Sequence, residues 1–241
     1  MKIAIISDIH GNLEAFQEVL TDIDRSGVDD LISLGDTIGY GPDPEQVIRL
    51  IRNRNIPSVI GNHELAIINH DFFDWFNPTA RLSLEKTVGF LSENSIQFIR
   101  TLNYTMVSHG CRFVHGFPPD SAITYLFQVA EDTLYRTFRQ MKERICFIGH
   151  THELRMIAFD GQDLSYRPLD EGTIRLENDH QYIINIGSVG QPRDGNNNAK
   201  YVIWDASNDE LHIRFIPYDI KTVADKILSA GLPDVHAMRL L

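Results

Sequence analysis

Apolar runs alternate with segments of helical periodicity over the first sixty residues. Positions 2–7 form a short apolar run, which is typical of a strand buried on both faces. After Asn12, a favourable N-cap, apolar residues recur at helical spacing between Leu13 and Ile23, and Gly27 ends this predicted helix. The alternation continues with a strand at 31–34, a helix that begins at Pro44 and a strand at 57–60. This order predicts a parallel sheet with helices on its faces.

The remaining chain passes from helical to extended patterns. Residues 65–105 are predicted to be mostly helical, short strands are expected at 104–107, 112–114 and 145–148, and a further helix is expected at about 128–142. Five later segments alternate apolar and polar residues and indicate a second, largely antiparallel sheet packed on the first: 155–159, 173–176, 182–186, 201–204 and 211–215. Turn residues at 207–209 indicate a hairpin, and a last helix at about 220–230 ends before Gly231 and Pro233.

Polar residues of metal-ligand type follow the predicted strands. Ligands gather at the carboxyl ends of the strands in parallel sheets, so we expect these side chains to meet. They are Asp8, His10, Asp36, Asn62, His63, His115, His150 and His152. Oxygen and imidazole donors without cysteine suit hard or borderline divalent metals. Eight residues exceed the needs of one ion, and seven of them can hold two ions if one carboxylate bridges.

Five sequence blocks carry a family resemblance. They are Asp8-Ile9-His10, Gly35-Asp36, Gly61-Asn62-His63-Glu64, Val114-His115-Gly116 and Gly149-His150-Thr151-His152. Their order resembles the calcineurin-like metallophosphoesterase superfamily, and nearly the whole chain is similar to its small prokaryotic members, which are diadenosine tetraphosphatase-related or phosphodiesterase-like. The resemblance implies a four-layer α/β/β/α sandwich of two mixed sheets flanked by helices. It implies one domain over residues 1–241, in which the helical segment at about 65–105 walls the active site.

The resemblance also implies a role for each of these residues. One metal would take Asp8, His10, Asp36 and His152, and the other would take Asp36, Asn62, His115 and His150. Asp36 would bridge two divalent ions (manganese, iron, zinc or nickel), which would activate a bridging hydroxide for in-line attack on phosphorus. His63 would protonate the leaving oxygen or stabilise the phosphoryl charge.

The implied function is metal-dependent hydrolysis of a small phosphodiester, a cyclic nucleotide or a dinucleoside polyphosphate. A protein phosphatase is an alternative, but the phosphate-binding arginines of that branch are missing, since Thr37 follows Asp36 and Glu64 follows His63. A scaffold that has lost catalysis is a further alternative, although the full ligand set argues against it. Tyr40 and Arg193 are candidate substrate contacts; a turn residue and a solvated loop arginine are the competing interpretations.

Several other residues have plainer interpretations. Clusters such as Phe72, Phe73, Trp75 and Phe76 usually belong to a core, which we favour over a pocket wall. Isolated histidines are usually surface or hydrogen-bonded core residues, and we expect this of His70, His109, His180, His212 and His236. A solvated carboxylate is the commoner interpretation for Glu64 and Glu153, and a supporting contact to a ligand is the alternative.

The composition of the chain limits the kinds of molecule that the protein is expected to bind. The chain has 241 residues, of which 22 are Lys or Arg and 33 are Asp or Glu, for a formal net charge of −11. This charge argues against a nucleic acid polymer, while a local cationic site can still bind a small phosphate ester. Cys111 and Cys146 lie in apolar runs and are expected to be core thiols. No signal peptide and no apolar run of roughly 20 residues is present, so we expect a cytoplasmic protein without a membrane partner.

Overall fold

The strand β1 (Lys2–Ile6) belongs to a five-stranded mixed sheet in the computed structural model, which describes residues 1–241. β1 pairs in parallel with β2 and antiparallel with β10. The other strands, in spatial order, are β2 (Asp30–Ser33), then β1, β10 (Ala199–Asp205), β11 (Glu210–Ile216) and β8 (Gly172–Arg175).

The second sheet has six strands and is also mixed. In spatial order they are β3 (Thr105–Ser108), β4 (Cys111–Val114), β5 (Ile145–Ile148), β9 (Gln181–Ile186), β6 (Leu154–Phe159) and β7 (Leu164–Pro168). β4, β5 and β9 run parallel, whereas β3, β6 and β7 pair antiparallel with their neighbours.

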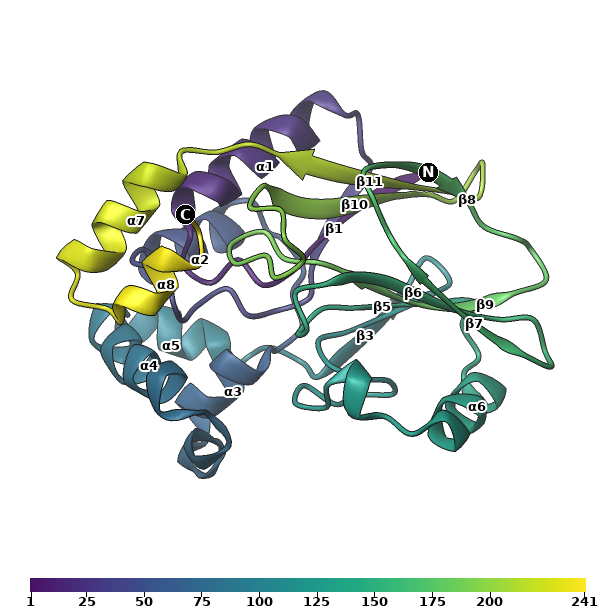
Figure 1. Ribbon diagram of the computed structural model, residues 1–241, viewed down its shortest axis with the longest axis horizontal. Helices are drawn as coiled ribbons and strands as arrows, with labels where there is room; N and C mark the ends of the chain where they lie inside the picture. Colours follow the sequence, from purple (N-terminus) through teal and green to yellow (C-terminus); the bar gives the residue numbers. More distant parts are fainter.

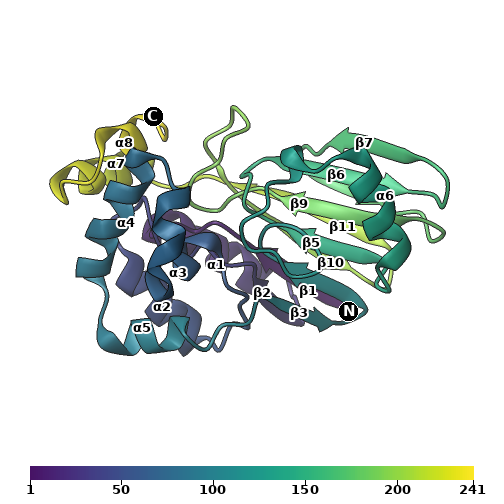
Figure 2. The same ribbon diagram turned by 90° about the horizontal axis from the view of Figure 1, so that it is seen from below.

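Four layers follow from the way these sheets bury their faces. The largest apolar core lies between the sheets, where Ile5 and Trp204 of one sheet belong to the same cluster as Phe113 and Phe147 of the other. The outer face of the first sheet is covered by α1 (Leu13–Arg25) and α2 (Pro44–Asn53). The outer face of the second sheet is covered by α6 (Glu131–Gln140). Figures 1 and 2 show these layers. The expected four-layer fold is confirmed, and both cysteines are buried in it.

Further helices cover one end of the sandwich. They are α3 (Asn62–Ile68), the 3₁₀ helix η1 (His70–Trp75), α4 (Pro78–Phe90), α5 (Glu93–Ile99), α7 (Ile220–Ser229) and α8 (Asp234–Met238), and a second 3₁₀ helix, η2 (Leu126–Gln128), precedes α6. In Figure 1 the end helices lie to the left of both sheets. None of the helices combines the length and apolarity needed to cross a bilayer.

Three expectations about strands and helices were wrong. Residues 57–60 do not form a strand, because they make only isolated bridges, Ser33 with Ser58 and Val59 with Asn103. The late strands do not form a sheet of their own: β8, β10 and β11 join the first sheet, while β6, β7 and β9 join the second. The alternation of apolar and polar residues shows that one face of a strand is buried, but it does not show to which sheet the strand belongs. The chain also forms β7 and α8, which the pattern did not predict.

Candidate metal centre

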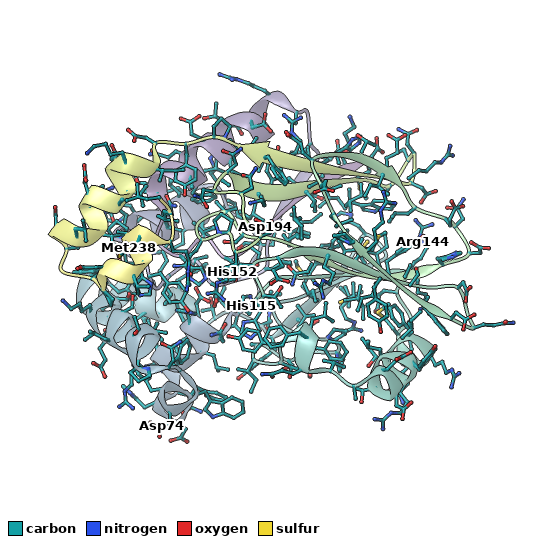
Figure 3. All side chains as sticks on the ribbon, viewed as in Figure 1. Asp74, His115, Arg144, His152, Asp194 and Met238 are labelled. Carbon is teal, nitrogen blue, oxygen red and sulfur yellow. The ribbon has the colours of Figure 1, made fainter.

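The strand-end residues converge where the two sheets meet the helical end. Asp8 follows β1 and Asp36 follows β2, both in the first sheet, whereas His115 follows β4 and His150 follows β5 in the second. All eight side chains are buried. Figure 3 shows His115 and the labelled His152 close together in the middle of the molecule. The two sheets therefore contribute to one site.

Short distances connect these side chains around two carboxylates. His152 Nε2 lies 3.2 Å from Asp8 Oδ1, and His115 Nε2 lies 3.3 Å from Asp36 Oδ2. His10 Nε2 lies 3.7 Å from both Asp8 Oδ1 and Asp36 Oδ2. Donor atoms of this kind at this separation can close around a cation placed among them.

The donors divide into three overlapping buried groups, within each of which the ligand atoms lie within 4.8 Å of one another. The groups are Asp8, His10 and His152; His10, Asp36 and His63; and Asp36, His115 and His150. Asn62 adds an oxygen, because its Oδ1 lies 3.1 Å from His115 Nε2. Asp36 thus has histidines on both sides, as a bridging carboxylate would require.

In four histidines, the ring nitrogen that points away from the cluster (the outer nitrogen) is hydrogen-bonded to a backbone carbonyl. The Nδ1–H groups of His10, His115 and His152 donate to Ile38, Leu34 and Gln191, at 2.8, 2.8 and 2.6 Å. The ring of His150 is reversed, with Nε2–H donating to Ile123 at 3.2 Å. A carbonyl can only accept, so each neutral ring turns a bare nitrogen toward the cluster. Metal-binding histidines are fixed in this way.

The nitrogen and oxygen atoms that face the interior of the cluster are better satisfied by a cation than by one another. His10 Nε2 and His152 Nε2 lie 3.1 Å apart, and with the outer nitrogens protonated both present lone pairs. Asp8 Oδ1 is buried and has no hydrogen-bond partner. Lone pairs and an orphaned carboxylate oxygen that face one another are unfavourable unless a positive charge lies between them.

His63 differs from the other four histidines. Its Nδ1 is buried without a partner, and no carbonyl fixes its ring. Its Nε2 lies 3.8 Å from Asp36 Oδ2, and its backbone N–H donates to Asp36 Oδ1 at 2.9 Å. Burial lowers the pKa of His63 well below its usual value, so the ring is neutral at pH 7. His63 therefore touches the cluster without the support that the other rings share.

The two carboxylates of the cluster also favour a positive charge beside them. Burial opposes protonation of His115, yet the carboxylates of Asp36 and Asp8 raise its pKa to about 9. Burial lowers the pKa of His150 to about 3 and of His152 to about 4. The metal-free cluster thus stabilises one proton on His115, and a divalent ion would compete for the same place.

Strained backbone presents the polar side chains. Nine non-glycine residues of the chain have positive φ, and six of them lie at the site with φ between 50° and 70°. These six are Asp8, His10, Asp36, Tyr40, His150 and His152. Such conformations cost about 1–3 kcal/mol each and persist where the surroundings enforce them, most often at functional sites.

Two glycines let separate segments approach within the cluster. A Cβ on Gly61 would overlap Asp36 Oδ1, and a Cβ on Gly149 would overlap Ser7 Oγ and Asp8 Oδ2. The glycines in these two sequence blocks therefore permit the contact between elements that the site requires.

Glu64 supports the loop that carries Asp36. It is fully buried and accepts hydrogen bonds from the backbone N–H of Asp36 at 2.8 Å, Thr37 at 2.7 Å and Gly61 at 3.1 Å. The Thr37 hydroxyl donates to it at 2.6 Å. The expected solvated carboxylate is wrong at this position. Glu153, by contrast, is half exposed and pairs with Arg155.

An aromatic cavity of about 100 Å³ adjoins the cluster at Asn62 and His150. Its other lining residues are Tyr40, Phe72, Trp75, Phe76, Asn77, Ala80, Ile123 and Tyr125. Of the four aromatic residues expected in a core, only Phe73 is fully buried there, and Trp75 is 67% exposed. Phe72 and Phe76 are half buried, pack against the same core cluster as Phe73 and also line the cavity. The core interpretation is therefore wrong only for Trp75, which lines the cavity from the surface.

Two candidate substrate contacts lie beside the cluster. The Tyr40 ring centroid lies 4.5 Å from that of His10 and 4.6 Å from that of His63. The guanidinium carbon of Arg193 lies 6.0 Å from the Tyr40 ring. Sequence reasoning missed Tyr125, whose ring stacks on His150 at 3.7 Å between centroids, and His236, which packs on Tyr40 at 4.7 Å. Neither lies in a motif, so no sequence signal marked them.

Comparisons with known proteins agree with this geometry. A family model described as a calcineurin-like phosphoesterase superfamily domain matches residues 1–209. The crystal structure of a metallophosphoesterase from Sphaerobacter thermophilus is similar, with 36% sequence identity and a TM-score of 0.86. That alignment covers 100% of this chain and 98% of the other.

Curated relatives extend the comparison. An uncharacterized protein of Methanocaldococcus jannaschii is 36% identical over 99% of this chain and 96% of its own length. A symmetrical bis(5'-nucleosyl)-tetraphosphatase of Chromobacterium violaceum is 28% identical over 57% of this chain and 54% of its own length.

Proposed function

Because the chain belongs to the calcineurin-like phosphoesterase superfamily and is a phosphoester hydrolase of that metal-dependent family, we propose that it works with two divalent ions. Asp8, His10, Asp36 and His152 would hold one ion. Asp36, Asn62, His115 and His150 would hold the other, with Asp36 shared between them.

The shared position of Asp36 carries this proposal. It belongs both to a buried donor group with His10 and to one with His115 and His150. Asp8 and His152 extend the first side, and Asn62 extends the second. One ion would leave several bare donors unsatisfied, whereas two ions would use all seven.

Two divalent ions bound here would supply Lewis-acid charge for a phosphoryl oxygen and lower the pKa of a water molecule. The chain's own residues set the charge of the site. Asp8 and Asp36 bring two negative charges against four positive ones, so an anionic phosphate is attracted despite the acidic surface. The carbonyls of Ile38, Leu34, Ile123 and Gln191 keep the imidazoles oriented.

His63 would act on the leaving oxygen. Its buried ring lies against Tyr40 and Phe76, two residues that line the aromatic cavity. The unpartnered Nδ1 and the loosely paired Nε2 leave one N–H free to donate to a developing negative charge. Such a donor stabilises the leaving group without holding a metal.

The substrate would be a small phosphoester, namely a phosphodiester, a cyclic nucleotide or a dinucleoside polyphosphate. The cavity of about 100 Å³ beside Asn62 and His150 has aromatic walls that suit a planar ring attached to the phosphoryl group. The tetraphosphatase of Chromobacterium violaceum belongs to the same group of relatives.

Metal removal and return test this proposal. The protein is dialysed against a chelator and then assayed with manganese, iron, zinc or nickel on bis(p-nitrophenyl) phosphate, p-nitrophenyl phosphate and a phosphopeptide. We expect no turnover without metal, and the highest kcat/KM on the diester once two ions are bound per chain. A protein that binds two ions but hydrolyses none of the three substrates would favour the scaffold alternative; preference for the phosphopeptide would favour a protein phosphatase.

A further inference from the structure

A second cavity, of about 290 Å³, lies next to the aromatic one and shares Tyr40, Asn77, Ala80 and Tyr125 with it. Its remaining lining residues are Thr79, Arg193, Val235, His236 and Arg239. Arg193 comes from the loop after β9, while the last three come from α8 and the residue that follows it. In Figure 3 the labelled Met238 of α8 lies to the left of His152.

The position of α8 is fixed by the body of the protein. Leu232, Ala237 and Leu240 pack with α7 in a small apolar cluster. Lys226 of α7 pairs with Glu14 of α1 at 2.8 Å and also with Asp43. The wall that α8 contributes to the cavity is thus tied to the first sheet through α1.

Two arginines in this cavity lack an acidic partner. No carboxylate lies within ion-pair distance of Arg193 or Arg239; the neighbouring Asp194 pairs with Lys200 at 2.8 Å instead. Both guanidinium groups donate to the same neutral atom, Gln191 Oε1, at 3.1 and 3.4 Å. Arg193 Nε is buried without any partner. Because the two guanidinium groups share one neutral acceptor, most of their N–H groups remain free to donate to an anion.

A buried histidine completes the cavity. His236 is 3% exposed, and neither of its ring nitrogens has a hydrogen-bond partner. An unpaired buried imidazole is costly unless a group absent from the free protein satisfies it. The His236 ring lies 4.7 Å from Tyr40, whose ring lies 4.5 Å from the predicted ligand His10. The cavity is therefore about one side chain away from the metal cluster.

We propose that Arg193, Arg239 and His236 bind a second phosphoryl group of the substrate while the reacting phosphoryl group lies at the metal cluster. The substrate class is then a compound with phosphoanhydride-linked phosphoryl groups, such as a dinucleoside oligophosphate. Arginine forks match phosphate oxygens in pairs, and a neutral imidazole adds one N–H donor. This inference rests on the proposed function, because it takes the reacting group to lie at the metals.

The first test compares two substrates in the metal-loaded enzyme. Arg239→Met removes one guanidinium group from an exposed residue, so the protein is expected to remain folded. We expect the ratio of kcat/KM for diadenosine tetraphosphate to kcat/KM for bis(p-nitrophenyl) phosphate to fall about tenfold or more, as loss of a charged hydrogen bond predicts. Arg100→Met, at an exposed arginine without an ion pair, is the matched control and should keep the wild-type ratio.

The second test measures binding without catalysis. Metal-stripped protein is titrated calorimetrically with inorganic tripolyphosphate. We expect Arg239→Met, Arg193→Met and His236→Gln each to weaken binding, the arginine variants about tenfold, and Arg100→Met to bind like the wild type. Equal affinity in Arg239→Met and Arg100→Met, or no binding by the wild type, would overturn the subsite. A wild-type enzyme that binds tripolyphosphate but hydrolyses nothing would instead contradict the proposed function.

Discussion

At the scale of single residues, the candidate centre is distinguished by what lies behind each imidazole. His10, His115, His150 and His152 each donate their outer N–H to a backbone carbonyl, and His63 does not. This contrast separates predicted ligands from a predicted donor to the leaving group more clearly than distance does, because all five rings lie near a carboxylate.

His63→Ala should therefore lower kcat on a diester about 10²- to 10⁴-fold while both ions remain bound. Metal content by atomic emission and steady-state kinetics measure the two effects. Asp36→Asn provides the comparison, since it should lose metal and activity together. Loss of metal from His63→Ala would identify His63 as a ligand instead.

Glu64→Gln should weaken metal binding about 10- to 100-fold, because the amide can no longer accept all the N–H groups that fix the Asp36 loop. Glu153→Gln is the matched control, since its half-exposed carboxylate contacts none of the ligands. Competition with a fluorescent chelator measures both affinities. Equal affinities in the two variants would show that Glu64 does not support the site.

At the scale of elements, the sequence predicted most strands, the helices α1, α2, α6 and α7, and the residues that meet at the strand ends. Periodicity and turn residues are local signals, and they suffice for these elements. Sheet membership is not local: β10 pairs with β1 across almost the whole chain. The rings of Trp75 and His236 depend on how η1 and α8 dock, so no local pattern could place them at the site.

The junction after β5 gives an element-scale prediction. Gly149→Ala should destabilise the protein by about 1–3 kcal/mol and weaken metal binding, because the new Cβ would overlap Ser7 and Asp8, which follow β1 of the other sheet. Gly89→Ala in α4 is the control: nothing lies near its Cβ, and alanine should stabilise the helix by about 0.5–1 kcal/mol. Urea unfolding measures both changes. A neutral effect of Gly149→Ala would contradict the close packing of this junction.

At the scale of the whole molecule, buried histidines couple stability to pH. Burial lowers the pKa of His150 to about 3 and of His152 and His236 to about 4, below the unfolded value of about 6.5. The unfolded chain then binds more protons between pH 6.5 and 4, so these groups reduce stability as the pH falls through that window. His115 acts oppositely: its stabilising effect is complete below pH 6.5 and is lost as the pH rises through about 9.

The free energy of unfolding of metal-free protein should therefore decrease from pH 7 to pH 4, and also from pH 7 to pH 9. Urea titrations across this range measure it. His236→Gln should reduce the slope on the acidic side. Stability that rises as the pH falls below 6.5 would contradict burial of neutral histidines.

The pairing of the first strand with the late strand β10 also bears on when the site can form during synthesis. β1 lies between β2 and β10, and the carbonyl that orients His152 belongs to Gln191. A nascent chain that ends before Ala199 has the eight strand-end side chains but lacks β10, the neighbour that completes the pairing of β1. If the chain binds metal as proposed, a product of translation that stops before β10 should lack a stable site and should not retain the cofactor.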